Sequence, residues 1–232
     1  MPDSRERLIV ALDVSSAAAA HNIVAAVGDS ARIYKVGMQL YTAEGPTVVR
    51  DLIASGRQVF LDLKYHDIPN TVGCAVMEAA KLGVRMLSVH AGGGGKMMHA
   101  AVEAARYTNP TTMILAVTVL TSLNERDLEH AGVRGSVVDQ VSRLAALAVS
   151  CGCHGVVASA QEAGTLRGEL GDDFVIVTPG VRPAGSGHDD QARVVTPSEA
   201  IAAGANYIVV GRPITEAADP AAEAREILAQ IG

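Results

Sequence analysis

The chain has 232 residues, of which 49% are hydrophobic and 19% charged, a composition typical of a globular protein with ample material for a core. Its formal net charge of −6 argues against nucleic acid or an anionic membrane as a partner, although local N–H groups and one or two cations still suffice for a small anion. The apolar runs are too short for a transmembrane span, and MPDSRERLIVALDV does not read as a signal peptide. Three cysteines, an odd number, favour a reducing cytoplasm over a disulfide framework.

Short apolar or β-branched runs recur at a steady interval along the whole chain, and we expect each to be a β-strand. The eight runs cover residues 8–14, 32–40, 58–65, 86–91, 113–120, 155–160, 174–180 and 207–211.

Segments with helical periodicity lie between these runs, for example 15–29 and 135–152. Ser15 or Ser16 is expected to cap the first of them. The sequence Thr196-Pro197-Ser198-Glu199 predicts another helix start, and the last helix is expected from about Asp219-Pro220 almost to Gly232.

Strands that alternate with helices predict right-handed βαβ units and a parallel sheet. Eight units in a chain of this length predict an α/β fold, the (β/α)₈ TIM barrel. A single domain over residues 1–232 is expected, because no linker or shift in composition divides the chain. A doubly wound open sheet is the alternative, but the first strand–helix turn, ALDVSS, lacks a G-x-G-x-x-G motif.

Polar residues gather where the predicted strands end, which is the face that carries the active site in TIM barrels. A single site at the barrel mouth explains why they occur after nearly every strand. These residues are Asp13, Lys35, Asp62, Lys64, His90, Thr121, Ser122, Ser159, Arg182, Gly211 and Arg212.

The densest cluster of charges lies in FLDLKYHDIPNT, residues 60–71. Alternation places Asp62 and Lys64 on one face of a strand, roughly 6–7 Å apart along it, and Asp67 follows. Salt bridges that merely close the barrel mouth are one interpretation. Lys35 on the neighbouring strand favours a second interpretation. In it, the residues form an alternating chain of charges in which carboxylates keep each lysine protonated. Such an array holds a proton donor where a carbanion develops.

The last strand, YIVVGRPIT, predicts a phosphate site built from the N–H groups of Gly211 and Arg212 and the Arg212 guanidinium. The alternative is an ordinary surface arginine after a strand. The Gly- and Pro-rich segment 179–191 is typical of a functional lid or a disordered spacer, and Arg182 and Gln191 within it could both reach a phosphate.

The sequence Cys151-Gly-Cys153-His154 raises the question of a metal site. Structural zinc sites generally use C-x₂₋₄-C spacing with a second pair of ligands elsewhere, so we interpret this segment as a helix end that leads into a strand. No metal is predicted.

The segments FLDLKYHDIPNTV, LIVALDV, YKVGMQL, VTVLTS, VTPGVRP and IVVGRPIT together resemble the bacterial orotidine 5′-phosphate decarboxylase family. The match follows the family's order over nearly the whole chain, and Tyr65 stands where the family has Phe. The resemblance implies a homodimeric TIM barrel that converts orotidine 5′-phosphate to uridine 5′-phosphate, the last step of de novo pyrimidine synthesis. It also implies that neither a metal nor an organic cofactor takes part.

The same resemblance implies roles for individual residues. Lys64 would protonate C6 of the pyrimidine as CO₂ leaves, and Asp62 would lie near the substrate carboxylate. Lys35 would complete the array and contact the ribose, and Asp67 would reach into the partner's site. The other implied substrate-binding residues are Asp13 for a ribose hydroxyl, Ile68, Thr71, Thr121 and Ser122, and for the phosphate Arg182, Gln191, Gly211 and Arg212.

Two alternatives share the barrel. A Mg²⁺-dependent 3-keto-L-gulonate 6-phosphate decarboxylase or hexulose-phosphate synthase would carry a metal-binding glutamate on strand two, where this chain has Lys35. A non-catalytic barrel that binds a nucleotide or sugar phosphate would be expected to have lost the catalytic charges, yet Lys35, Asp62, Lys64 and Asp67 are all present.

Overall fold

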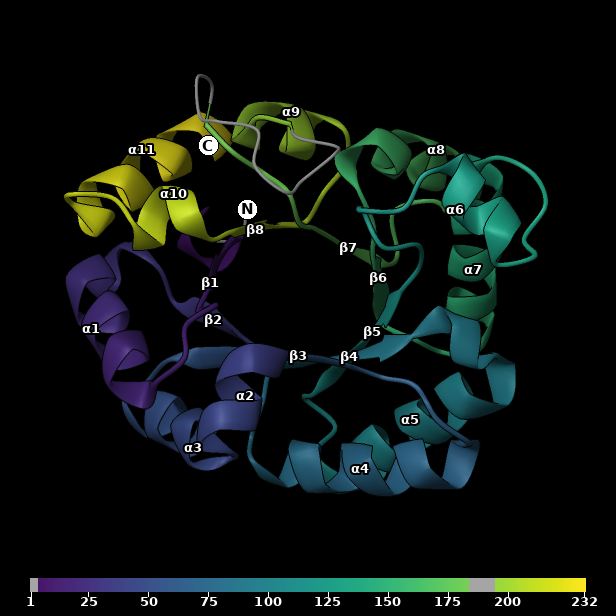
Figure 1. Ribbon diagram of the computed structural model, residues 1–232, viewed down its shortest axis with the longest axis horizontal. Helices are drawn as coiled ribbons and strands as arrows, with labels where there is room; N and C mark the ends of the chain where they lie inside the picture. Colours follow the sequence, from purple (N-terminus) through teal and green to yellow (C-terminus); the bar gives the residue numbers. More distant parts are fainter. Residues whose placement is uncertain (1–3, 184–194) are drawn as a thin grey trace.

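The computed structural model describes residues 4–183 and 195–232 and forms a closed barrel of eight parallel strands (Figure 1). The strands follow the order of the chain, and β8 pairs with β1 to close the ring. Helices surround the ring on the outside (Figure 1). The predicted TIM barrel is therefore confirmed, and the open-sheet alternative was wrong.

Each of the eight predicted runs contains one observed strand. The strands are β1 (Leu8–Ala11), β2 (Ile33–Gly37), β3 (Gln58–Tyr65), β4 (Met86–His90), β5 (Met113–Val117), β6 (Gly155–Val157), β7 (Val175–Thr178) and β8 (Tyr207–Val210).

Most predicted strands were too long at their C-terminal ends. The run 32–40 is the clearest case, because the chain turns into a helix at Met38. Apolar residues beyond the last ladder hydrogen bond line the barrel mouth or begin a helix, and their pattern resembles that of the strand itself. Ser159, expected within strand six, instead caps the next helix, where its hydroxyl accepts the Gln161 N–H.

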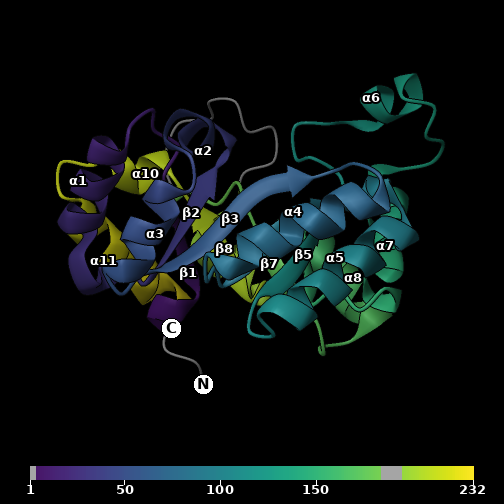
Figure 2. The ribbon, with the colours of Figure 1, turned by 90° about the horizontal axis from the view of Figure 1, so that it is seen from below.

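The helices are α1 (Ala17–Val27), α2 (Met38–Glu44), α3 (Thr47–Ala54), α4 (Pro69–Lys81), α5 (Gly95–Thr108), α6 (Glu125–His130), α7 (Val137–Ser150), α8 (Ala160–Leu170), α9 (Pro197–Ala202), α10 (Arg212–Thr215) and α11 (Pro220–Ile231). Figure 2 shows α6 standing clear of the other helices, at the end of the molecule to which the β3 arrow points.

The helix starts follow the expected capping chemistry. Ser16, rather than Ser15, caps α1 by accepting the Ala19 N–H. Thr196 and Glu199 form a reciprocal capping box at α9, and Asp219 caps α11. None of the described helices is both long and apolar enough to cross a bilayer.

The cysteine-containing segment is the predicted helix end that leads into a strand. Helix α7 ends at Ser150 and β6 begins at Gly155. Between them, the Nδ1 atom of His154 accepts the backbone N–H of Ile114, and Cys153 is buried.

Two apolar layers form the core, one inside the barrel and one between the strands and helices. Ile33, Phe60 and Met86 belong to the inner layer. Because side chains alternate along a strand, the positions two residues further on also face the interior. These positions are Lys35, Asp62 and Ser88, so the strand period itself carries polar groups to the top of the barrel.

Strand β3 is irregular at the end that carries the charges. Leu61 pairs with Leu87 and Tyr65 with Val89, so four steps along β3 match two along β4. Lys64, within this bulge, is the one non-glycine residue of the described chain with a positive φ, 53°. Asp62 and Lys64 do face the same side, as expected from the sequence, but the strand between them is not regular, because a bulge re-aims side chains locally.

Arg167 of α8 ties together the N-terminal ends of β7 and β8. Its guanidinium donates to the carbonyls of Gly204, at 2.9 and 3.0 Å, and Phe174, at 2.8 Å, and also to Oδ1 of Asn206. The same Asn206 oxygen accepts the Ile176 N–H of β7 at 2.8 Å. These two strands lead to Arg182, Gly211 and Arg212, so Arg167 supports the frame of the predicted phosphate site.

Replacing Arg167 with alanine should lower the free energy of unfolding by about 2–4 kcal/mol, because two part-buried backbone carbonyls and the Asn206 side-chain oxygen lose a charged donor together. Urea denaturation followed by circular dichroism measures this change. Arg106→Ala, which removes an exposed i,i+3 pair with Glu103, is the control and should cost less than about 0.5 kcal/mol. Equal losses for the two variants would contradict the anchoring role.

Candidate active site

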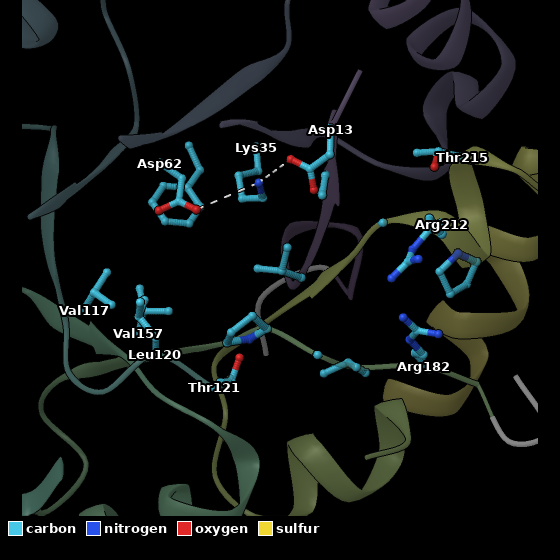
Figure 3. A pocket seen from close by; sticks show the side chains of 18 of the residues that line it. Asp13, Lys35, Asp62, Val117, Leu120, Thr121, Val157, Arg182, Arg212 and Thr215 are labelled. Atoms are coloured by element: carbon cyan, nitrogen blue, oxygen red, sulfur yellow. Dashed lines mark hydrogen bonds and ion pairs between the residues drawn. The ribbon is translucent and has the colours of Figure 1, made fainter. Parts of the chain in front are cut away.

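A cavity of about 560 Å³ opens at the C-terminal end of the barrel (Figure 3). Residues from β1, β2, β3 and β5, and from the segments that follow β7 and β8, reach it. The sequence-predicted residues that line this cavity are Asp13, Lys35, Asp62, Lys64, Thr121, Arg182, Gly211 and Arg212.

Four charged side chains form a continuous chain along one wall. The Lys35 Nζ atom lies 2.8 Å from Oδ1 of Asp13 and 3.9 Å from Oδ2 of Asp62 (Figure 3). The Lys64 Nζ atom lies 2.7 Å from the same Asp62 oxygen. The two ammonium groups expected from the sequence therefore do share one carboxylate and one cavity.

Burial raises the free-energy cost of this arrangement of charges. The side chains of Asp62 and Lys35 are only 10% and 12% exposed, and that of Lys64 is 27% exposed. Charges removed from water are costly unless they are paired and hydrogen bonded. Here Oδ2 of Asp62 faces both ammonium groups, and Oδ1 accepts a hydrogen bond from the Ser88 hydroxyl at 2.8 Å. Both oxygens of the carboxylate are thus engaged.

Sequence reasoning missed two parts of this group. It assigned Asp13 to a ribose hydroxyl without recognising that Asp13 pairs with Lys35. It also missed Ser88, which is fully buried on β4 between the inward positions of Met86 and His90. The sequence did contain a signal for Ser88. It is a serine at an inward-facing position of the predicted strand that follows the Asp62 strand.

Gly37 leaves room for the Asp13–Lys35 pair. A Cβ atom at this position would lie 3.1 Å from Asp13 Oδ1 and 3.1 Å from Lys35 Nζ. The backbone of Gly37 is extended, so the constraint here is space and not conformation.

A cationic end lies on the opposite side of the cavity. Figure 3 shows the guanidinium groups of Arg182 and Arg212 near each other and well separated from Asp62. Arg182 is buried, and its backbone N–H donates to the Val195 carbonyl at 2.9 Å. Gly211 precedes the first turn of α10, which begins at Arg212. Two arginines beside the exposed N–H groups of a turn suit an anion such as a phosphate.

An apolar wall faces the charged chain. Phe60, Val117, Leu120 and Val157 line the cavity, and Figure 3 shows the last three together. Thr121 adds a hydroxyl between this wall and the two arginines (Figure 3). The cavity therefore has charged, apolar and cationic regions that differ in what each can hold.

Several sequence-predicted residues lie away from this cavity. Asp67, Ile68, Thr71 and Ser122 are exposed and do not line it. The Oδ1 atom of Asp67 accepts the neighbouring Ile68 N–H at 2.6 Å. Gln191 lies outside the described residues.

His90 does not line the cavity either. Its ring stacks on that of His66 with centroids 5.2 Å apart, and its Nδ1 atom accepts the Gly92 N–H. Burial, and secondarily the neighbouring His66 and Lys64, lowers the pKa of His90 below its usual value. His90 therefore packs as a neutral ring at neutral pH.

The described part of the chain contains no group of three or more His, Cys, Asp or Glu side chains arranged to hold a metal ion. Three carboxylates line the cavity, those of Asp13, Asp62 and Glu216. Asp13 and Asp62 face lysine ammonium groups, so this pair is already neutralised by fixed cations.

The family model described as "Orotidine 5'-phosphate decarboxylase / HUMPS family" matches residues 6–227. The chain belongs to this family. A curated relative from Idiomarina loihiensis named orotidine 5'-phosphate decarboxylase is 50% identical over 226 residues, which are 97% of this chain and 98% of the relative. One of the same name from Afipia carboxidovorans is 52% identical over 227 residues, 98% and 95% of the two chains.

A solved structure agrees with the orotidine 5'-phosphate decarboxylase / HUMPS family assignment. The crystal structure of orotidine 5'-phosphate decarboxylase from Lactobacillus acidophilus superimposes with a TM-score of 0.89 at 38% identity. The match covers 98% of this chain and 99% of the other, so the likeness extends over the whole barrel.

Proposed function

We propose that this enzyme decarboxylates orotidine 5′-phosphate to uridine 5′-phosphate and CO₂. The observation that carries the proposal is the pair of lysine ammonium groups that face one buried oxygen of Asp62 in a cavity with two arginines at its other end. Relatives that are 48–52% identical over nearly the full chain are named orotidine 5'-phosphate decarboxylase, which supports this proposal.

The regions of the cavity match the parts of the substrate. The phosphate would bind between Arg182 and Arg212 and accept hydrogen bonds from the N–H groups of Gly211 and Arg212. The ribose would lie beside Asp13 and Lys35, whose oxygen and nitrogen atoms are 2.8 Å apart. The pyrimidine would then lie between the apolar wall and Lys64, with Thr121 at its polar edge.

Loss of CO₂ breaks the bond between C6 and the carboxylate and leaves the electron pair on C6, an sp² carbon whose ring π-system cannot delocalise it. Stabilisation must therefore be largely electrostatic. Lys64 is the ammonium at the inner end of the charged chain, and it would donate a proton from Nζ to C6. The resulting neutral amine regains a proton from solvent before the next turnover.

Asp62 contributes by position. Its carboxylate pairs with the Lys64 ammonium at 2.7 Å inside the cavity, and a substrate carboxylate placed beside it would meet a like charge. That repulsion is relieved when neutral CO₂ departs. Phosphate binding at the far end can offset this cost, because binding energy from a remote group is usable at the reacting centre.

We propose that the reaction uses neither metal nor organic cofactor. The family description also covers HUMPS enzymes, the hexulose-phosphate synthases named above as an alternative. Mg²⁺-dependent chemistry is therefore the alternative to test. The β2 position that would need a metal-binding carboxylate is Lys35, whose ammonium is held by Asp13 and Asp62. Full turnover after EDTA treatment is expected, and dependence on added Mg²⁺ would favour the alternative.

A homodimer with shared sites would explain the residues that lie outside the cavity. Asp67 and Ile68 are exposed just before α4, and Ile68 and Met38, which follow the C-terminal ends of β3 and β2, are 67% and 57% exposed. We propose that this face packs against a second copy and that Asp67, with Ile68 and Thr71, completes the partner's site. Residues 1–232 would act as one domain of a cytoplasmic enzyme of pyrimidine synthesis.

Lys64→Ala should lower kcat by at least about 10³-fold, because the other ammonium of the cavity, that of Lys35, is held between Asp13 and Asp62 beside the proposed ribose position. Orotidine 5′-phosphate added to metal-free enzyme gives an ultraviolet change that reports turnover. The variant should still bind uridine 5′-phosphate, as measured by calorimetry. Lys81→Ala, an exposed lysine paired with Glu78 on α4, is the matched control. Substantial activity in Lys64→Ala would reject the proton-donor role, and inactive wild-type enzyme would reject the function.

Arg212→Ala should raise KM for orotidine 5′-phosphate by about 10- to 100-fold, since each charge-assisted hydrogen bond contributes about 1.5–3 kcal/mol. Turnover of phosphate-free orotidine should change far less. Steady-state kinetics with both substrates separates the two effects, and Arg143→Ala on α7 serves as a control. Equal losses for both substrates would be inconsistent with a phosphate site at Arg212.

Mixing Asp67→Ala subunits with Lys64→Ala subunits should restore activity if each site takes Asp67 from the partner. Random exchange at equal concentrations gives half heterodimers with one complete site each, hence about a quarter of wild-type activity. Tagged subunits and native mass spectrometry verify the heterodimers. Verified heterodimers without recovered activity would contradict the shared site.

A further inference from the structure

The Ser88 hydroxyl connects two parts of the charged chain. Its Oγ atom donates to Oδ1 of Asp62 at 2.8 Å and accepts the backbone N–H of Lys64 at 2.9 Å. Ser88 is fully buried on β4, so no water competes for these contacts from solvent. Its neighbours on the inner side of β4 are the core residue Met86 and the stacked His90.

The direction of these hydrogen bonds is determined by their partners. An amide N–H can only donate, so Lys64 must give its hydrogen to the Ser88 oxygen. The carboxylate of Asp62, held by two ammonium groups, can only accept, so the single hydroxyl hydrogen of Ser88 must point at Oδ1. Since Lys64 Nζ binds Oδ2 of the same carboxylate, the contacts form a closed ring that begins and ends at Lys64.

This closed ring of hydrogen bonds lies where the backbone of β3 is strained. Lys64 has a φ of 53°, which side chains other than glycine adopt at a cost, and it lies in the bulge where the ladder between β3 and β4 is interrupted. In a regular ladder the Lys64 N–H would bond to a carbonyl of the adjacent strand. Ser88 supplies the acceptor that the bulge removes.

We propose that Ser88 is a positioning residue that locks the Lys64 backbone and the Asp62 carboxylate in one arrangement and thereby aims the ammonium of Lys64 into the cavity. This inference rests on the proposed function for its kinetic consequence, although its geometric consequence does not depend on it. Ser88 itself does not line the cavity and would not touch the substrate.

Ser88→Ala should therefore lower kcat by about 10- to 100-fold, the effect of losing a hydrogen bond to a charged group together with a buried N–H acceptor. KM for orotidine 5′-phosphate and the affinity for uridine 5′-phosphate should stay within about twofold, because the arginines, Asp13 and Thr121 are unchanged. A general loss of folding would instead reduce the amount of active protein and bound product together.

Two further variants test whether a loss of kcat comes from the position of Lys64 or merely from the removal of a buried hydroxyl. Ser88→Thr keeps the hydroxyl and should retain most of kcat. Thr112→Val removes another buried hydroxyl, which donates to the Val84 carbonyl at 2.8 Å at the opposite, N-terminal end of the barrel. It should leave kcat per folded molecule unchanged. A kcat of Ser88→Ala within twofold of wild type, or an equal loss in Thr112→Val, would overturn the proposal.

A crystal structure of ligand-free Ser88→Ala gives a readout that needs no activity. We expect Lys64 to leave its positive φ or its Nζ to move from the 2.7 Å contact with Asp62 Oδ2. An unchanged backbone and contact would contradict the proposal even in an active enzyme. If wild-type protein releases no CO₂, the proposed function fails, and this structure alone then decides whether Ser88 positions Lys64.

Discussion

The buried carboxylate of Asp62 is the interaction on which the site depends. It is stable away from water only because two ammonium groups and a hydroxyl converge on it from three adjacent strands. Removing any one partner would leave charge or hydrogen-bonding capacity unpaired in a region of low dielectric. The barrel must therefore hold β2, β3 and β4 in one register, in which Gly37 pairs with Asp62 and Leu61 with Leu87.

The cavity separates a cationic end from an end that carries interleaved charges. Two arginines and a helix start lie at one end, whereas the interleaved lysines and aspartates lie at the other, beside an apolar wall. In the proposed reaction, this separation lets the arginines attract the phosphate strongly while the Asp62 carboxylate repels the substrate carboxylate at the other end. Catalysis requires such a difference, because uniform attraction along the substrate would lower KM without raising kcat.

The family shows why a fold alone does not determine chemistry. Its description joins orotidine 5'-phosphate decarboxylases with HUMPS enzymes, so the reaction must be argued from the residues of the site and not from the fold. In this chain Lys35 fills the β2 position, and its contacts with Asp13 and Asp62 leave a neutral, fully paired cluster. Under the proposed function, this one side chain is what distinguishes the chain from the Mg²⁺-dependent alternative on the same barrel.

Local sequence patterns were enough to predict the strand–helix alternation, helix starts at Ser15 or Ser16, at Thr196 and at Asp219, and the end of the barrel that carries the polar residues. These features depend on local capping, periodicity and the direction of parallel strands, all of which are readable along the chain. Tertiary structure decided the ends of the strands, the Asp13–Lys35 pair, and the bulge that Ser88 completes. Those features arise from contacts between strands, whose register and stagger a single strand's pattern does not encode.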